Sequence, residues 1–89
     1  VSASRPLSLV AHEYAHAFGW QMLTQSLRDE FMARLGKSAW DDGTYGARPT
    51  EVWAYNLGRC HGYPLNVKYT RVKCSVIKDF EKRAKAARG

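Results

Sequence analysis

The sequence predicts a mainly α-helical domain of about four helices with little or no β-sheet. Apolar residues recur at intervals of three and four along most of the chain, as they do on the buried side of a helix. Typical capping and stop residues bound the expected helices. The chain has 89 residues, 45% of them hydrophobic, a size and composition typical of one small globular domain.

The first expected helix covers residues 7–20. Ser4 is a candidate N-cap for it, and Pro6 is tolerated in its first turn. Several residues follow helical spacing on one side of it, namely Leu9, His12, Glu13, His16 and Trp20. Gly19 either ends this helix or lies where another part of the chain packs closely.

The second expected helix covers residues 24–35, with Thr24 or Ser26 capping its N-terminus. Its apolar stripe consists of Leu27, Phe31 and Leu35. Gly36 can adopt the left-handed conformation that ends a helix. Residues 37–48 are rich in turn-forming types, so we expect a loop there.

The third expected helix covers residues 49–60 and is opened by Pro49 and Thr50. Its apolar members are Val52, Trp53, Leu57 and Cys60. A fourth, basic amphipathic helix is expected from Thr70 onward. Its apolar side is formed by Val72, Val76, Ile77, Phe80 and Ala84.

The basic residues are concentrated at the C-terminal end of the chain. The net charge is +6, and residues 68–88 hold eight basic and two acidic residues, whereas residues 1–67 hold six of each. We therefore divide the chain into a catalytic core, 1–67, and a basic amphipathic helix, 68–89, that packs on the core or extends from it. A solvated helix face explains this charge better than an anionic partner does. Nucleic-acid binding by this segment ranks last among the hypotheses, because interleaved aromatic residues are lacking.

The apolar runs and the two cysteines bear on membrane insertion, on disulfide bonding and on the compartment. No apolar run approaches the roughly 18 residues that a bilayer span needs, so we expect no membrane span. Cys60 and Cys74 are the two cysteines, and a disulfide between them would stabilise the fold by roughly 3 kcal/mol. The sequence leaves open whether they are bonded. The compartment is not determined, with a secreted or virion-associated protein slightly favoured over a cytoplasmic one.

A zinc-binding motif, H-E-x-x-H, lies inside the first expected helix and consists of His12, Glu13 and His16. Residues four apart on a helix lie one turn above each other, so two imidazoles can reach one cation at roughly 2.0 to 2.1 Å. Glu13 points at the space beside the metal. A carboxylate in that position can take a proton from a metal-bound water and pass it to a leaving group.

Zinc needs a third protein ligand, and an open fourth position makes a site catalytic. The position where a metzincin has its third histidine is Met22. The other common solution is a glutamate on a later helix. Glu51 fits this solution, because it lies 35 residues after His16 near the start of the third expected helix. Its alternative role is that of a first-turn acid complementing the helix dipole.

The HEYAH segment, followed by a glutamate in a downstream E-x-x-A helix, resembles the gluzincin branch of zinc metallopeptidases. Small peptidase domains of actinobacterial and phage proteins are similar in outline. The resemblance covers residues 9–57, and only the HExxH motif is highly specific. It implies a compact zincin-like domain, Zn²⁺ held by His12, His16 and Glu51, and Glu13 as the general base.

The same resemblance implies hydrolysis of a peptide or protein substrate. Gluzincins usually carry a β-sheet before the HExxH helix, and its edge strand pairs with the extended substrate. Only eleven residues precede His12 here. We therefore expect that the sheet lies outside this piece or that substrate is held in another way.

Other site residues are predicted from their types. Tyr45 and His61 are candidate transition-state stabilisers, and Tyr45 is also explained as a packing residue. Asn56 is expected to support a metal ligand from behind. Large aromatic side chains are needed to fill a small helical fold, so the predicted core includes Trp20, Trp40 and Trp53.

The leading hypothesis is a zinc-dependent metallopeptidase that hydrolyses peptide bonds with a water activated by Glu13 and bound to zinc. The alternative is a non-catalytic, metal-stabilised structural or docking module of a larger assembly such as a phage tail protein. In that case its partners would be other parts of the assembly or of a longer parent chain. An open position on the metal would favour the enzyme.

Overall fold

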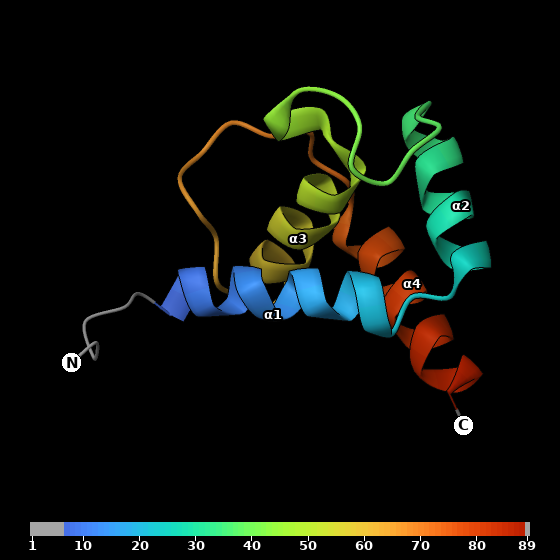
Figure 1. Ribbon diagram of the computed structural model, residues 1–89. Helices are drawn as coiled ribbons and strands as arrows, with labels where there is room; N and C mark the ends of the chain where they lie inside the picture. The colour runs from blue at the N-terminus through green and yellow to red at the C-terminus, as the bar shows by residue number, and fades with distance from the viewer. Residues whose placement is uncertain (1–6, 89) are drawn as a thin grey trace.

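Four α-helices make up most of the computed structural model, which describes residues 7–88 and, of Tyr45, only the backbone (Figure 1). The elements are α1 (Leu7–Gln21), α2 (Gln25–Leu35), the short 3₁₀ helix η2 (Tyr45–Ala47), α3 (Pro49–Cys60) and α4 (Cys74–Ala87). Residues 7–88 contain no strand. The predicted mainly α class is therefore confirmed. None of the helices in this part of the chain is long and apolar enough to cross a bilayer.

The helix ends follow from local chemistry. The Thr24 hydroxyl accepts a hydrogen bond from the Leu27 amide at 3.1 Å, so Thr24 rather than Ser26 caps α2. Gly36 ends α2 with φ 71°, the left-handed conformation expected of it. Pro49 occupies the first turn of α3. It lacks a backbone N–H, but an N–H at this position would have no acceptor within the helix. The predicted cap Ser4 and the neighbouring Pro6 lie outside the described residues.

The start of α4 differs from the prediction. The helix begins at Cys74 rather than at Thr70. The backbone before it is bonded to α3 instead: the Asn56 amide donates to the Thr70 carbonyl at 2.9 Å, and the Val72 amide donates to Asn56 Oδ1 at 2.9 Å. Arg59 also donates to the Val72 carbonyl, at 2.7 Å. These bonds hold the segment in a non-helical conformation along α3.

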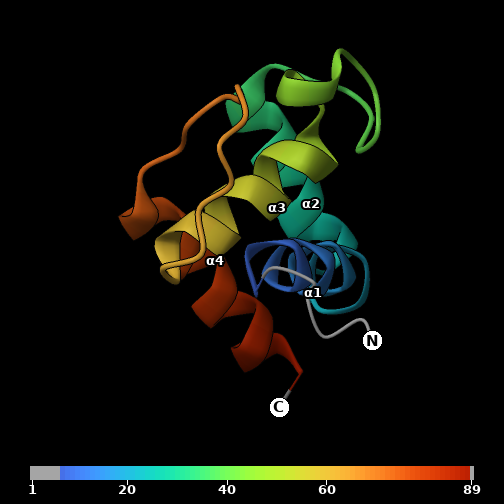
Figure 2. The ribbon, with the colours of Figure 1, turned by 90° about the vertical axis from the view of Figure 1, so that its left-hand side faces the viewer.

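Helix α3 lies in the middle of the molecule, with α1, α2 and α4 packed around it (Figure 2). All its residues from Pro49 to Gly58 are buried. Aromatic rings of three helices meet at its centre, where Phe31 contacts both Trp53 and Phe80 edge to face, with ring centroids 5.4 and 5.5 Å apart. Gly19 is buried against this core. A Cβ there would lie 3.0 Å from the Trp53 ring, so the glycine allows α1 to pack closely.

The three tryptophans do not share one environment. Trp40 and Trp53 are in the core as predicted, but Trp20 is 54% exposed, so its assignment to the core is wrong. Trp20 lies one turn after His16, close to the metal ligands but nearer the solvent-facing side of α1. Arg28 and Trp40 contact its ring but leave about half of the side chain exposed.

The link between α3 and α4 is covalent. Cys60 and Cys74 are bonded to each other, and they are the last residue of α3 and the first of α4. The disulfide that the sequence left open is therefore present. It closes a loop with a sequence separation of 14, which corresponds to a stabilisation of roughly 3 kcal/mol.

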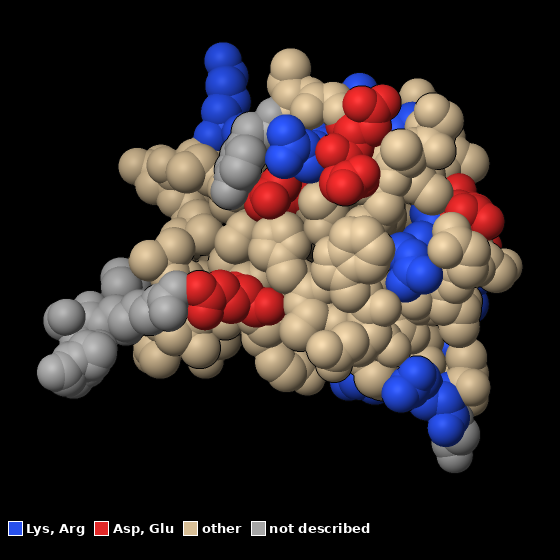
Figure 3. All heavy atoms as spheres, viewed as in Figure 1, with Lys and Arg blue, Asp and Glu red and all other residues tan. Residues whose placement is uncertain are grey.

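Ion pairs join the basic helix α4 to the rest of the fold. Arg83 donates to both carboxylate oxygens of Glu30 on α2, at 3.0 and 2.6 Å, and to Asp79 at 3.2 Å. Lys85 pairs with Glu81 at 3.4 Å. On the face shown in Figure 3, basic and acidic side chains alternate over the upper and right-hand parts. Arg83 and Lys85 of α4 are therefore paired with acidic side chains of the fold.

Candidate metal centre

The two histidines of the HExxH motif lie next to each other on α1. The helix runs without a break from Leu7 to Gln21, so His12 and His16 are one turn apart. Their Nε2 atoms are 3.1 Å from each other, and their rings are nearly perpendicular, with centroids 4.6 Å apart. Both ring nitrogens are therefore directed at one point, as the spacing predicted.

Glu51 completes the group from the first turn of α3. Its Oε1 atom lies 3.1 Å from Nε2 of His12 and 3.1 Å from Nε2 of His16. The carboxylate is nearly buried, and the N-terminal end of a helix favours its negative charge. The structure thus brings together all three residues predicted as metal ligands, and we refer to them as the triad.

The donor atoms of the triad have the chemistry and the spacing of a zinc site. Three ligands in a tetrahedral arrangement with bonds of roughly 2.0 to 2.1 Å lie about 3.3 Å from one another. The three pairwise distances here are all 3.1 Å. Two imidazole nitrogens and one carboxylate oxygen form a common ligand set for catalytic zinc. A divalent cation therefore fits these residues.

Thr50 orients one of the ligands from behind. Nδ1 of His16 lies 3.1 Å from the Thr50 hydroxyl, and the Thr50 amide donates to the Trp40 carbonyl at 2.8 Å. When Nδ1 donates to the hydroxyl, Nε2 keeps its lone pair for a cation. Sequence reasoning missed this role, although the position of Thr50 directly before Glu51 in the first turn was a usable signal.

The supporting residue predicted from the sequence was Asn56, and this prediction is wrong. Its side chain is bonded to Val52, Arg59 and the segment at Thr70 and Val72, all away from the histidines. His12 has a different kind of support. Its ring packs against the Tyr55 ring at 4.3 Å, and its buried Nδ1 has no hydrogen-bond partner among the described residues.

The surroundings of His12 favour its neutral form. Burial lowers the pKa of His12 below its usual value of 6.5, and the positive charge of a protonated His16 lowers it further. The charges of Glu51 and Glu13 and the hydrogen bond to Glu51 raise the pKa, but the net effect is a lowered pKa. Because neutral imidazole is the form that binds metal, the site holds His12 ready for a cation at neutral pH.

Glu13 is at the exposed edge of the triad. Its side chain is exposed, and its charge acts on His12 directly. The residues of α1 that face the core are Ala15, Phe18 and Gly19, so Glu13 projects from the side that faces solvent. This is the position that the motif predicts for a group working beside a metal.

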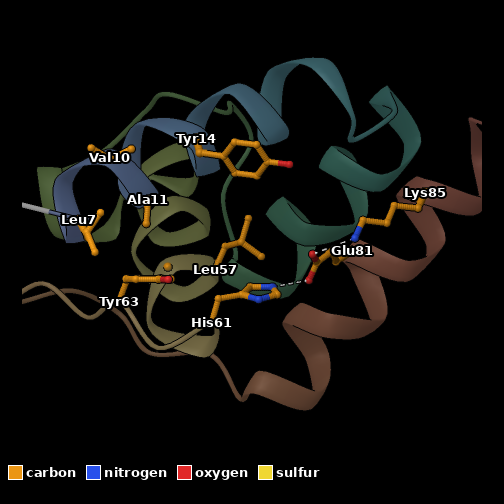
Figure 4. A pocket seen from close by; sticks show the side chains of 10 residues that line it. Leu7, Val10, Ala11, Tyr14, Leu57, His61, Tyr63, Glu81 and Lys85 are labelled. Carbon is orange, nitrogen blue, oxygen red and sulfur yellow. Dashed lines mark hydrogen bonds and ion pairs between the residues drawn. The ribbon is translucent and has the colours of Figure 1, made fainter.

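His61, a predicted transition-state stabiliser, lies elsewhere. It follows the last turn of α3, ten residues and about 15 Å along the helix axis from Glu51. Its Nε2 atom is 2.9 Å from Glu81 on α4, so it is bonded there and not directed at the triad (Figure 4). The structure therefore does not bring His61 to the triad. The side chain of the other candidate, Tyr45, lies outside the described part of the chain.

A cavity of about 500 Å³ among the described residues is separate from the triad. It lies between α1, the C-terminal part of α3 and α4, with Tyr14, Leu57 and His61 among its lining residues (Figure 4). Tyr14 is two residues from both His12 and His16, which places it on roughly the opposite side of the helix. The cavity and the triad thus use different sides of α1.

No family model, curated protein or solved structure matches this chain. The resemblance to gluzincins therefore depends on the HExxH motif and on the position of Glu51 alone.

Proposed function

We propose that the protein is a zinc-dependent metallopeptidase. The observation that carries the proposal is the convergence of three donor atoms, from His12, His16 and Glu51, at mutual distances of 3.1 Å beside an exposed Glu13. Only three residues of ligand type converge in the described part of the chain. Closed structural zinc sites use four protein ligands, so three ligands favour a catalytic site with one open position.

Each residue has a role in this proposal. His12, His16 and Glu51 would hold the metal, and Thr50 keeps the His16 ring in orientation. Zinc, when bound, supplies a Lewis acid that polarises a carbonyl and makes water more acidic. Glu13 accepts a proton from the attacking water as the new C–O bond forms. It then donates the proton to the amide nitrogen as the C–N bond breaks, which leaves a carboxylic acid and an amine, and the proton of the acid passes to the amine.

The exposure of the ligands supports access from one side. The His16 side chain is 27% exposed, whereas those of His12 and Glu51 are 11% and 10% exposed. Solvent and substrate would therefore approach past His16 and Glu13. The buried carboxylate on the opposite side stays fixed by the first turn of α3.

The disulfide supports a proposal on location. Structural disulfides persist mainly in oxidising surroundings such as the cell exterior or the surface of a virion. The Cys60–Cys74 bond thus favours a secreted or virion-associated protein.

The test combines metal analysis with a peptidase assay. Protein purified without added metal is analysed for zinc and incubated with an unfolded protein substrate, with and without a chelator. Glu13→Gln should keep its zinc and lose about 10²- to 10⁴-fold in activity, because the carboxylate that moves the proton is gone. Glu51→Ala should lose zinc as well as activity.

Glu30→Gln is the matched control, since it makes the same change at an exposed position of α2 and should leave zinc content and activity within twofold. Full activity of Glu13→Gln would contradict the mechanism. Bound zinc without hydrolysis would favour the non-catalytic module. Absence of zinc would contradict both the peptidase and the metal-stabilised module.

A further inference from the structure

Two large apolar side chains are exposed on the side of α1 that carries the metal ligands. Leu9 is 39% exposed and Trp20 is 54% exposed. Leu9 lies about one turn before His12, and Trp20 lies one turn after His16. Because the two side chains flank the metal ligands and Glu13, an extended ligand lying across the triad would meet both of them.

The Trp20 ring is held in place from two directions. The Arg28 guanidinium lies 5.7 Å from its centroid, and the Trp40 ring meets it edge to face at 6.4 Å. Arg28 itself is fixed, because it donates to the backbone carbonyls of Gly19, Trp20 and Leu23 at 3.2, 3.3 and 2.7 Å. A ring that is already ordered loses little entropy when a ligand packs on it.

The spacing of these two side chains matches an extended peptide. With a rise of 1.5 Å per residue, Leu9 and Trp20 are about 16 Å apart along α1. An extended chain covers about 3.3 Å per residue, so about five residues span this distance. A scissile bond above the triad would then place side chains two or three residues away against Leu9 and Trp20.

The charge of Arg28 limits which substrate side chains can pack on Trp20. Its cation already lies near the Trp20 ring, so a Lys or Arg of the substrate would meet like charge there. An aromatic or large aliphatic side chain can pack on the exposed part of the ring without this cost. The surface therefore selects apolar residues over basic ones.

We propose that Trp20 and Leu9 form two apolar subsites that bind an extended peptide on either side of the triad. Trp20 selects an aromatic or large aliphatic residue two or three positions from the scissile bond. The inference rests on the proposed peptidase function for the position of the scissile bond. The structure offers a matched control on the same helix, because Tyr14 is also exposed but lies on the opposite side.

The experiment first maps cleavage positions in an unfolded protein substrate. Two quenched fluorescent peptides are then built around a mapped site, with either Phe or Ala at the position predicted to meet Trp20. Trp20→Ala should lower kcat/KM by about tenfold or more for the Phe peptide and by less than twofold for the Ala peptide. Trp20→Phe should keep most of the preference, and Tyr14→Ala should leave it unchanged. Equal losses on both peptides would overturn the subsite.

A binding measurement separates this inference from the peptidase proposal. The Glu13→Gln variant is titrated by calorimetry, with and without zinc, with two Ala-rich peptides that differ only in having Phe or Ala at one central position and that need no mapped cleavage site. The Phe peptide should bind about tenfold more tightly than the Ala peptide, and adding Trp20→Ala should abolish the difference. A Trp20-dependent difference in affinity, together with a wild type that has no peptidase activity, would support the peptide-binding surface and contradict the peptidase proposal. Cleavage by the wild type without a difference in affinity between the two peptides would contradict the Trp20 subsite and support the peptidase proposal.

Discussion

The two ends of α3 carry similar groups and differ in how those groups are arranged. At the N-terminal end, Glu51 meets His12 and His16 in a nearly buried position, with all three donor atoms 3.1 Å apart. At the C-terminal end, His61 meets Glu81 at 2.9 Å, and the imidazole is half exposed. A histidine–carboxylate pair on the surface is satisfied by its own hydrogen bond. Convergence of a further ligand in a buried position is what distinguishes a candidate metal centre from such a pair.

The two ends also differ in what holds them to the rest of the fold. The N-terminal end of α3 contacts α1 through the polar side chains of the triad, which a bound cation would link to one another. The C-terminal end is joined to α4 by the Cys60–Cys74 bond. Chelation and reduction should therefore act on different ends of the same helix.

Removal of zinc should have the largest effect. Zinc in small structural sites contributes about 10 to 16 kcal/mol, and a chain of this length has a total stability of only roughly 4 to 13 kcal/mol. A strong chelator should lower Tm by more than about 10 °C, measured by differential scanning calorimetry. The Glu51→Ala variant should have the Tm of the chelator-treated wild type, and the chelator should not lower this Tm further. An unchanged Tm in the wild type would count against an occupied site.

Removal of the disulfide should have the next largest effect. The double variant Cys60→Ser, Cys74→Ser should lose about 3 kcal/mol of unfolding free energy, because the unfolded chain regains the freedom of the loop. Chemical denaturation measures this loss. If the two ends of α3 act separately, the variant keeps its zinc and the chelator effect remains. Loss of zinc from this variant would show that the ends are coupled.

Replacement of Thr50 should affect metal affinity more than stability. Thr50→Val keeps the shape but removes the oxygen that faces Nδ1 of His16, so zinc affinity should fall about 10- to 100-fold. Competition with a zinc-binding dye measures this change. Thr70→Val is the control, because Thr70 is exposed and its hydroxyl has no contact with the triad. Equal affinities for the two variants would exclude a positioning role for Thr50.

Acidification of the metal-free protein should have the smallest effect. Because the pKa of His12 is lowered by burial, the unfolded chain binds this proton at a higher pH than the folded chain. Stability from this group is therefore present above the ordinary pKa of 6.5 and declines as the pH falls below it. Urea unfolding at several pH values measures the decline. His61→Ala should show the same decline, since the exposed pair at the other end of α3 is not its source.

The helices were predictable because their signals are local. Thr24 and Gly36 bound α2 through bonds to residues only a few positions away. The placement of His12 and His16 on one side of α1 follows from the helical period alone. The start of α4 was wrong because residues 70–73 are bonded to Asn56 and Arg59 on another helix. No pattern within the segment itself contains that information.

The sequence by itself determined a helical chain, a pair of histidines with a glutamate beside them, and the type of ligand that was still required. Only the tertiary structure decided that Glu51 reaches the histidines, that Thr50 stands behind one of them, and that His61 and Asn56 face elsewhere. It also decided that Trp20 is exposed while Trp53 is buried. The physical reason is that helical periodicity arranges side chains within one element, whereas the packing of α1 on α3 selects which sides of two distant elements meet.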